Sequence, residues 1–386
     1  MKVLVLGGSG RVGKGAAWDL VKSNDVSKVV LGDVRVEEAK RYVERVGNNK
    51  LTAEYVDLRD FQRLIEKIRQ FDVVANATWF EHVVGVTKAV IDAKRHCCDA
   101  GGFYYDSLKQ LELNEFAKKA GITVIMGMGN SPGITNIFVS YGAAKLDKVG
   151  GIHIIAGGHV AKPGSKVSGR SMTIRTNFEE LTSNPMVFQD GKMKEVSPLS
   201  GKEKVFFPEP LGEREVFFTR HSEMATLPGF RGAKNVDVKI HFSLESREQI
   251  RILEDLGLTS KNPIKIGNME IEPRKFLLEC LYSHPNEAKE PEGEDITANQ
   301  VVIIGEKEGE RVQYTYDLIV EQDFKWGNQK TGVPMSIGCQ MLGRGDIQER
   351  GVLPPEVCVD PEKFLIELKK REGFKLVEEY KRIRTL

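Results

Sequence analysis

Short apolar runs alternate with amphipathic stretches over the first 130 residues of the chain. The apolar runs have the length of buried strands and cover residues 3–6, 29–32, 51–56, 72–75, 97–100 and 122–126. The stretches between them, such as 61–71 and 108–121, repeat their apolar residues at helical spacing. This alternation predicts an α/β fold class, with a doubly wound parallel sheet of the Rossmann type.

The pattern changes after about residue 150, where β-rich segments with turn signals follow one another. We predict a strand at 152–158 and hairpins that turn at Asp190-Gly191 and near Gly309. Residues 247–258 and 274–282 have helical spacing, and the polar segment 283–295 is typical of an exposed loop. These segments predict an inserted α+β second domain with a mixed or antiparallel sheet.

Helical spacing returns at 332–345 and 361–373, near the end of the chain. We therefore predict a dinucleotide-binding domain of residues 1–130 that is completed by C-terminal helices within 331–386. Residues 131–330 are expected to form the α+β substrate and dimerisation domain.

Composition and charge exclude several classes of protein. The 386 residues include 56 Lys and Arg against 55 Asp and Glu, which is not the balance of a nucleic-acid or anionic-membrane binder. Met1 and Lys2 lead directly into an apolar run, so we expect no secretory leader, and no apolar stretch approaches the roughly 20 residues of a membrane span. The five Cys lack metal-ligand spacing. We expect a cytoplasmic protein with reduced thiols, no bound metal and a small-molecule ligand.

A glycine-rich turn after the first strand carries the clearest chemical signal. Gly8, Gly10 and Gly13 match the GxGxxG pattern, and a helix is expected to begin near Arg11. Such a turn lets main-chain amides at the start of the helix face a pyrophosphate. We therefore expect a nicotinamide dinucleotide over the whole turn, with cofactor contacts from Gly8, Ser9, Gly10, Arg11, Val12 and Gly13.

Polar residues follow three further strands at the carboxyl edge of the predicted sheet. Asp33 lies where a carboxylate can accept hydrogen bonds from a ribose and repel a 2′-phosphate, which favours NAD. Arg35 could instead pair with that phosphate, so NADP remains possible. Asp57 is a candidate cofactor contact or a loop cap. Further cofactor contacts are expected from Asn76, Ala77 and Thr78.

A second interpretation of the same region has to be weighed. Gly7, Gly10 and Gly13 also fit the GxxGxxG pattern of extended or atypical short-chain dehydrogenases, and Tyr141 and Lys145 supply a Tyr-x-x-x-Lys pair. Against this, about 240 residues of largely β-patterned chain follow, more than such a fold needs. A non-catalytic NAD-binding regulator is a third hypothesis, of a different class.

Several longer motifs together resemble the saccharopine dehydrogenase family, which includes lysine 6-dehydrogenases and carboxynorspermidine dehydrogenases. They lie at residues 76–84, 98–113, 127–136, 331–342 and 349–356, and the resemblance extends over nearly the whole chain. It implies a Rossmann domain, a mixed α/β second domain, a cleft between them and, usually, a homodimer. The implied chemistry is reversible oxidation of a carbon–nitrogen bond, in which hydride passes to the nicotinamide and water hydrolyses the resulting imine.

This chemistry needs a group that takes protons from the amine and from water. Asp99 ends the fifth strand, where partial burial would raise its pKa toward neutrality, and it is our first candidate for the base. His82 and Tyr104 are alternatives, although each could equally be a structural residue.

The chemistry also needs groups that hold the substrate against the nicotinamide. Ser131 and Pro132 are suited to the cap and first turn of a helix, whose amides would face a carboxylate or, with Gly133, the nicotinamide amide. In the segment 219–232, Arg220, His221 and Arg231 are candidate substrate contacts, with Glu223 nearby, unless this is simply a solvated loop. Arg170 and Arg175 are weaker candidates.

Overall fold

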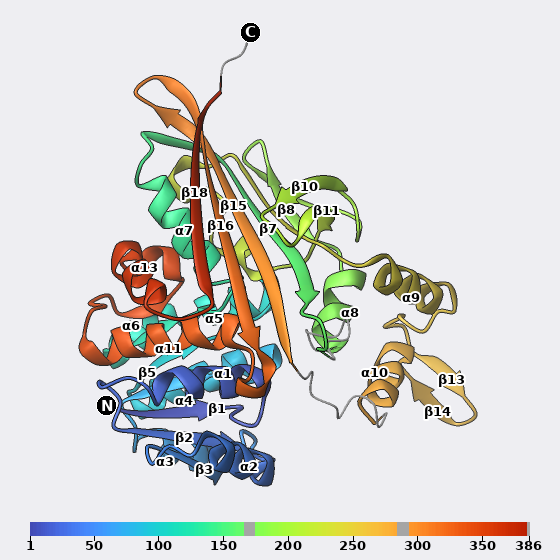
Figure 1. Ribbon diagram of the computed structural model, residues 1–386. Coiled ribbons are helices and arrows are strands. Elements are labelled where there is room, and N and C mark those ends of the chain that lie inside the picture. Colours follow the sequence, from blue (N-terminus) through green and yellow to red (C-terminus); the bar gives the residue numbers. More distant parts are fainter. Residues whose placement is uncertain (166–173, 284–292, 384–386) are drawn as a thin grey trace.

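The computed structural model describes residues 1–165, 174–283 and 293–383. Most of the loop predicted at 283–295 lies outside the described residues, as do Arg170 and the side chain of Arg175. Two sheets lie one above the other, and the long strands of the second extend away from the first toward the C-terminus (Figure 1).

The first sheet is the predicted doubly wound sheet. Its seven strands run in the order β3-β2-β1-β4-β5-β6-β17, and all neighbouring pairs are parallel. Six strands lie where the apolar runs predict them: β1 (Lys2–Leu6), β2 (Lys28–Asp33), β3 (Leu51–Tyr55), β4 (Val73–Asn76), β5 (His96–Asp99) and β6 (Thr123–Ile125). The seventh strand, β17 (Gly351–Leu353), escaped prediction because Val352 and Leu353 are flanked by Gly351 and Pro354 and form no apolar run like that at 122–126.

Helices cover both faces of this sheet, which is why its strands are apolar throughout. Val3 and Val5 of β1 face the core that includes α1 and α11, whereas Leu4 and Leu6 face the core that includes α3 and α4. The helices of this layer are α1 (Arg11–Leu20), α2 (Val36–Val46), α3 (Phe61–Ile68), α4 (Val83–Ala93), α5 (Tyr104–Leu111), α6 (Asn114–Ala120), α11 (Gln329–Arg344) and α13 (Pro361–Lys369).

One expected helix, at 108–121, is two. The chain breaks after Leu111, so that α5 contacts the short helix η2 (Ser222–Ala225) of the second layer while α6 packs beside β17.

The second sheet has nine strands and is mixed, as predicted. β12 and β7 are parallel and the other pairs are antiparallel. Both predicted hairpins are present, and positive φ angles at Asp190, Gly191 and Gly309 form their turns. The strands are β7 (Lys148–Ala161), β8 (Met186–Gln189), β9 (Lys192–Glu195), β10 (Glu203–Phe207), β11 (Gly212–Phe218), β12 (Asn235–Ile240), β15 (Glu294–Lys307), β16 (Glu310–Asp323) and β18 (Phe374–Arg382).

We expected only helices in the C-terminal segment, but it also contains a strand. After α13 the chain forms β18, which pairs with β16 at the edge of the second sheet. Its mostly exposed, charge-rich sequence conceals the strand pattern, as is usual for edge strands. The remaining elements are α7 (Ile134–Ala143), α8 (Ile174–Thr182), α9 (Leu244–Asp255), α10 (Pro273–Ser283), α12 (Pro355–Cys358), η1 (Phe80–His82), η3 (Phe230–Gly232), η4 (Phe324–Trp326), β13 (Ile264–Ile266) and β14 (Met269–Ile271).

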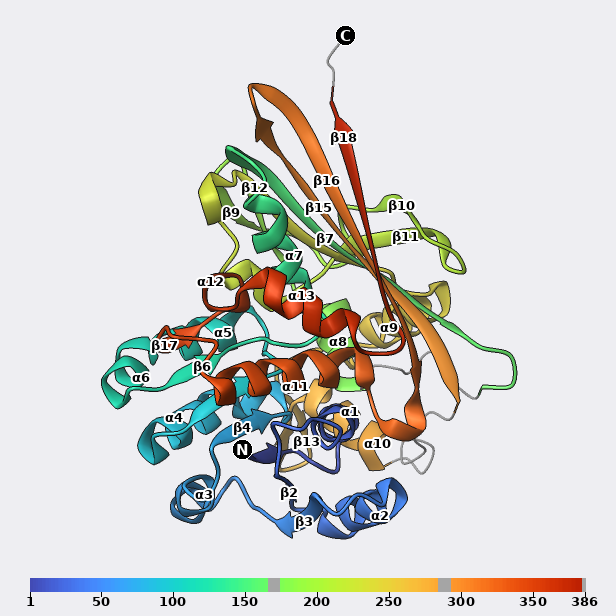
Figure 2. The ribbon, with the colours of Figure 1, turned by 60° about the vertical axis from the view of Figure 1, so that its left-hand side comes forward.

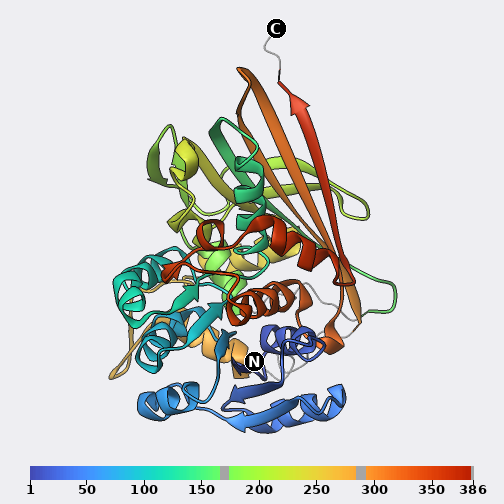
Figure 3. The ribbon, with the colours of Figure 1, turned by 90° about the vertical axis from the view of Figure 1, so that its left-hand side faces the viewer.

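Helix α11 joins the two layers (Figures 2 and 3). It packs on α1, β4 and β5 on one side and contacts β16 on the other. One core cluster therefore contains Val3 of β1, Met335 of α11 and Val301 of β15. Buried Asp19 of α1 strengthens the joint by accepting hydrogen bonds from Ser336 (2.7 Å) and Arg371 (3.1 Å). Among the described residues, no helix has the length and apolar character required to cross a bilayer.

Candidate functional site

The turn between β1 and α1 has the geometry of an anion-binding loop. The amides of Gly7 and Gly8 donate to the Gly32 carbonyl oxygen (3.0 and 3.2 Å), which holds the turn over the end of β2. A Cβ atom on Gly8 would lie 2.6 Å from Cβ of Leu31, and one on Gly13 would lie 2.5 Å from the Gly7 oxygen. Gly10 caps α1 without a side chain, and the first turn carries no acidic residue. The positive end of the helix is therefore left for an external anion.

Asp33 is fixed at the end of β2, directly beside this turn. Its carboxylate accepts hydrogen bonds from the amides of Ser9 (3.0 Å) and Arg35 (2.9 Å). The Ser9 hydroxyl is buried and has no protein partner, so a ligand could satisfy it. The Arg35 guanidinium is mostly exposed and lies 3.3 Å from Glu38. These residues fit a nicotinamide dinucleotide, with Asp33 placed for its ribose.

Residues 76–78 contact the same turn, whereas the Asp57 carboxylate is bonded to Arg59. A Cβ atom on Gly7 would lie 2.6 Å from the Ala77 oxygen, and the buried Asn76 amide oxygen accepts from the Thr78 hydroxyl at 2.6 Å. Asp57 accepts from the amide (2.9 Å) and guanidinium (2.7 Å) of Arg59, and these hydrogen bonds lower the pKa of Asp57 to about 2. Its contacts are those of a loop cap, and its cofactor contact stays a prediction.

Asp99 is buried at the end of β5 and ties two loops together. One carboxylate oxygen accepts from the amides of Gly101 and Gly127, both at 2.8 Å, and the other accepts from the Gln110 side chain. Burial raises the pKa of Asp99, and these hydrogen bonds oppose the rise. Both oxygens are therefore engaged in fixing the loops after β5 and β6, and the role of base stays a prediction for this residue.

The two alternative candidates lie nearer the surface. His82 is exposed at the end of η1, while Tyr104 is half-buried at the start of α5 with its ring against Tyr105 at 5.0 Å. Burial raises the pKa of Tyr104.

We expected Ser131 to cap a helix, and this prediction is wrong: Ser131 belongs to a buried cluster. Helix α7 begins only at Ile134, with Gly133 as its cap residue and the Gly133 amide donating to Asn136 at 3.0 Å. The Ser131 hydroxyl instead donates to one oxygen of Glu223 at 2.6 Å. The sharp entry at Gly133, with a φ of 127°, moves Ser131 out of the helix and toward the second layer.

Glu223 and His221 form a buried ion pair at the centre of this cluster. Nδ1 of His221 bonds one carboxylate oxygen of Glu223, and the other oxygen accepts from Ser131 and from Thr135 at 3.1 Å. Burial acts to lower the pKa of His221, but the charge and hydrogen bond of Glu223 outweigh it and raise the pKa. Burial likewise acts to raise the pKa of Glu223, and His221 holds it below its ordinary value. Each partner therefore stabilises the charged form of the other.

The two arginines of the predicted substrate segment lie in different places. The Arg220 guanidinium lies over the rings of Phe103 (5.4 Å) and Tyr105 (5.1 Å), so it bridges from the second layer to the start of α5. Arg231 is exposed and donates to the Ala143 oxygen at the end of α7 (3.5 Å). The structure thus brings Ser131, His221 and Glu223 together. Arg231 lies at the end of α7 and is not part of this cluster.

A small cavity adjoins this cluster. It has a volume of about 10 Å³ and is lined by Ser107, Gly127, Pro132, Asn136 and Glu223, among others. This is room for about one water molecule. The cavity places Glu223 beside the loop after β6, at the carboxyl edge of the first sheet.

Sequence reasoning missed four polar residues near this cluster: Glu180, Lys330, His159 and Asp295. Glu180 of α8 is buried with one carboxylate oxygen unpartnered, and burial raises the pKa of Glu180 to about 7. No motif links these residues, because they come from α8, α11, β7 and β15. The one available signal was polar residues at every second position, Asp295, Thr297 and Asn299, alternating with apolar Ile296 and Ala298.

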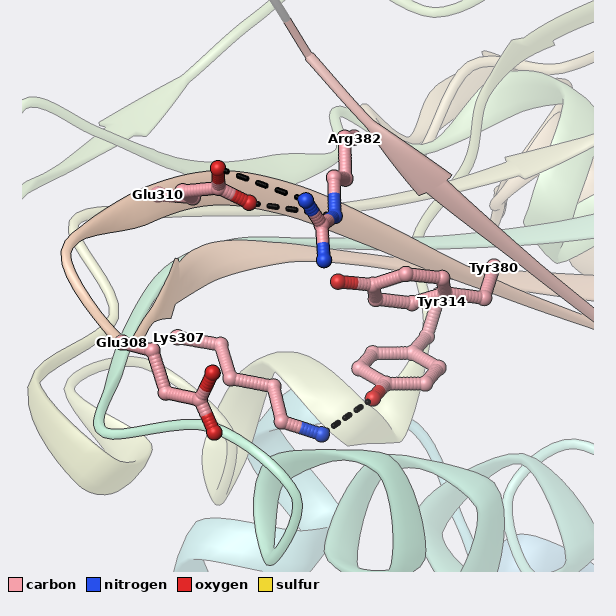
Figure 4. A pocket seen from close by; sticks show the side chains of 6 residues that line it. All are labelled: Lys307, Glu308, Glu310, Tyr314, Tyr380 and Arg382. Atoms are coloured by element: carbon pink, nitrogen blue, oxygen red, sulfur yellow. Dashed lines mark hydrogen bonds and ion pairs between the residues drawn. The ribbon is translucent and has the colours of Figure 1, made fainter.

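A larger hollow lies at the far end of the molecule from the glycine turn (Figures 1 and 4). It has a volume of about 370 Å³ beside the β15–β16 turn and the end of β18. Arg382 pairs there with Glu310 at 3.1 Å, and Lys307 donates to the Tyr314 hydroxyl at 3.2 Å. Its distance from the first sheet separates it from the dinucleotide chemistry.

Comparison with known proteins identifies the family. The family model described as "Saccharopine dehydrogenase NADP binding domain" matches residues 3–125, and the one described as "Saccharopine dehydrogenase C-terminal domain" matches residues 129–374. The chain belongs to the saccharopine dehydrogenase family. The predicted resemblance is confirmed, and the chain is an NAD(P)-dependent dehydrogenase of the class that acts on CH–NH bonds, with a nicotinamide nucleotide as cofactor.

Relatives span the whole chain at low identity. A carboxyaminopropylagmatine dehydrogenase from Synechocystis is 24% identical over 95% of both chains. A carboxynorspermidine synthase from Vibrio alginolyticus is 24% identical over 93% of this chain and 92% of its own. The structure of saccharopine dehydrogenase (L-Glu forming) from Saccharomyces cerevisiae, 18% identical, superimposes with a TM-score of 0.72 over 98% of this chain and 99% of its own, which shows a shared fold.

The Tyr141–Lys145 pair is built into the packing of the second sheet. The Lys145 ammonium lies 4.0 Å from the centre of the Tyr141 ring and pairs with Glu378 of β18. The Tyr141 ring also meets that of Tyr316 on β16 at 5.8 Å. These contacts account for both side chains without a catalytic role.

The glycine turn gives the first testable prediction. In Gly13→Ala the new methyl group would overlap the Gly7 oxygen, so we expect the Kd for NADH to rise more than tenfold, a loss of at least about 1.4 kcal/mol. Fluorescence titration measures it. Gly85→Ala is the matched control, because Gly85 is exposed on α4 and no heavy atom lies within 4 Å of the added Cβ. Equal affinities for the two variants would contradict the assignment.

Glu180 gives a prediction about pH. Its pKa is raised from 4.5 to about 7 in the folded state, so the folded protein holds this proton more tightly than the unfolded chain. The associated stability is fully present below pH 4.5 and is lost as the pH rises through about 7. Glu180→Gln keeps the neutral form, so we expect its advantage over the wild type to grow between pH 5 and pH 8, to roughly 2–3 kcal/mol.

Thermal unfolding at the two pH values measures this difference. Glu44→Gln, on the exposed face of α2, serves as the control and should shift the Tm equally at both. A Tm difference between Glu180→Gln and the wild type that does not change with pH would rule out the raised pKa.

Proposed function

We propose that this enzyme oxidises a carbon–nitrogen bond of an amino acid or of a saccharopine-like secondary amine, reversibly and with hydrolysis of the imine. The observation that carries the proposal is the buried His221–Glu223 pair, held by Ser131 at the loop that follows β6. This loop and the glycine turn both lie at the carboxyl edge of the first sheet, where open parallel sheets bind their ligands. The names of the relatives, which refer to carboxylated polyamine precursors, support a substrate of this kind.

When bound, the nicotinamide accepts or supplies the hydride. The chain has to remove a proton from the amine and to activate water for hydrolysis. We place these proton transfers at Nε2 of His221, because Nδ1 is bonded to Glu223 and the carboxylate stabilises the imidazolium. Asp99 is less suited, since donors occupy both of its oxygens. Asp99 instead holds the loop that contains Gly127, and Glu223 lies against the same small cavity as this loop.

We also propose that NAD is preferred over NADP. The buried Asp33 carboxylate next to Ser9 suits a ribose diol and opposes a phosphate at the same place. Arg35, which could pair with that phosphate, is mostly exposed and lies 3.3 Å from Glu38 and 3.8 Å from Asp33. A cytoplasmic homodimer remains our expectation for the assembly and its location.

The activity test uses NAD and NADP with lysine, saccharopine and carboxynorspermidine, followed at the absorbance of the reduced nicotinamide. We expect turnover with at least one substrate, and a kcat reduced by about 10²-fold or more in His221→Asn, because general acid–base catalysis contributes roughly 10²–10⁴-fold. The Kd for NADH should not change.

Tyr141→Phe is the matched control, since it keeps the ring that packs on Tyr316. The main proposal predicts near wild-type kcat for it, whereas a short-chain dehydrogenase mechanism predicts its inactivation. Full activity of His221→Asn, or no turnover with any substrate, would refute the proposal.

The nucleotide preference is tested separately with Asp33→Asn. Removal of the charge should weaken NAD binding and relieve repulsion of the 2′-phosphate, so that the ratio of the two Kd values shifts toward NADP by roughly tenfold, or about 1.4 kcal/mol. Glu37→Gln, an exposed neighbour on α2, should leave the ratio unchanged. Tighter binding of NADP than of NAD by the wild type would be inconsistent with the proposal.

A further inference from the structure

The inner face of the second sheet carries polar groups that the protein does not satisfy. Asp295 of β15 is completely buried, and no donor meets the distance and angle of a hydrogen bond to either carboxylate oxygen. The Gln322 side chain, directly opposite on β16, lies close enough to lower the pKa of Asp295 against the effect of burial. Nδ1 of His159 on β7 lies 3.9 Å from one of the Asp295 oxygens and also lacks a hydrogen-bond partner, as does the amide nitrogen of Gln322. Buried polar groups are paired in the great majority of cases, so a cluster of such exceptions needs a reason.

This group of side chains lies at the end of β15 nearest the first layer. Asp295, Thr297 and Asn299 share a face with Val301 and Ile303, which belong to the core cluster common to both layers. The same ends of β15 and β16 lie beside α1 in all three ribbon views (Figures 1, 2 and 3). The unsatisfied groups therefore lie on the side of the second sheet that is turned toward the dinucleotide turn.

Lys330 links these groups to the dinucleotide turn. It belongs to the first turn of α11, and two residues earlier the Asn328 amide donates to the Arg11 carbonyl oxygen at 2.7 Å. The Lys330 ammonium interacts electrostatically with Asp295, Arg11 and Glu180. Within the described parts of the chain, it has no carboxylate within ion-pair distance. Lys330 thus lies in the field of two carboxylates without an ion pair to either.

Glu180 connects this group to the proton-transfer pair. One of its carboxylate oxygens is buried without a partner, and the Glu180 carboxyl interacts with the charges of His221 and Glu223 as well as with Lys330. The unsatisfied groups therefore extend from the proposed reaction centre at His221 to Asp295.

We propose that these side chains bind the amino-acid head group of the substrate: Asp295 and Glu180 take its ammonium, and Lys330 takes its carboxylate. This assignment rests on the proposed function. A zwitterionic head group supplies both missing partners at once, a cation for the unpartnered carboxylates and an anion for the lysine. A simple diamine would satisfy the carboxylates but would place like charge beside Lys330. The substrate class is accordingly an α-amino acid that keeps both charges.

Calorimetric binding to the full chain tests the assignment, with saccharopine, L-lysine and cadaverine as probes in the presence of NADH. We expect Asp295→Asn to weaken binding of the amino-acid probes by roughly tenfold to a hundredfold, as loss of a charged hydrogen bond does. Lys330→Met should abolish the preference for L-lysine over cadaverine. Unchanged affinities in both variants, or no binding of either amino acid to the wild type, would overturn the assignment.

Asp317→Asn is the control for Asp295→Asn. Asp317 is also a buried carboxylate of the long strands, but it accepts a hydrogen bond from Gln300 at 2.9 Å. This variant should leave the Kd of every probe unchanged.

A second measurement needs no substrate. If the role of Asp295 is to bind a ligand, Asp295→Leu removes a buried polar group without a hydrogen bond and should raise the Tm. Asp317→Leu removes the hydrogen bond from Gln300 and should lower the Tm. A lowered Tm in both would show a structural role for Asp295 and contradict the inference. The two proposals can fail separately. If the amino-acid probes bind and this binding depends on Asp295, but no substrate is turned over, only the proposed reaction is refuted.

Discussion

The close packing of α11 on α1 is the constraint on which the arrangement of this molecule depends. The two helices approach so closely that a Cβ atom on Gly332 would lie 2.3 Å from the amide nitrogen of Ala16. This contact brings a segment from the end of the chain to the helix that starts at the dinucleotide turn. It also places Lys330, at the first turn of α11, within the field of Arg11. The same joint thus holds the two sheets together and builds one wall of the site.

The site divides its chemistry between the two layers. The first sheet supplies main-chain amides and Asp33, which suit the invariant parts of a dinucleotide, whereas the second layer supplies Glu180, His221, Glu223 and Asp295. The groups that would distinguish one substrate from another therefore come from strands and loops that can vary without changing the nucleotide turn. This separation is consistent with a family whose relatives carry different substrate names at 24% identity.

Local pattern was sufficient to predict six of the seven strands of the first sheet and insufficient for the site. Strands buried on both faces are continuous apolar runs, so β1 to β6 could be located, and Asp190-Gly191 and Gly309 identified two hairpins through their turn chemistry. The strands β17 and β18 depend on pairing with distant partners and have no pattern of their own. Glu180, Asp295 and Lys330 come together only through the packing of three elements, which no spacing in the sequence encodes.

The buried charges also explain why this region is organised as it is. His221 and Glu223 compensate each other, and Ser131 and Thr135 satisfy the remaining oxygen, so this pair is stable without a ligand. Asp295 and Glu180 are compensated less well: Lys330 acts on both without an ion pair to either, and burial still raises the pKa of both carboxyl groups. A cation bound at Glu180 would favour the charged form of this carboxylate, and that charge in turn favours the imidazolium form of His221. The Glu180 carboxylate in this way couples substrate recognition to proton transfer. Its interactions are with Lys330, His221 and Glu223, and not with Asp33 or the glycine turn.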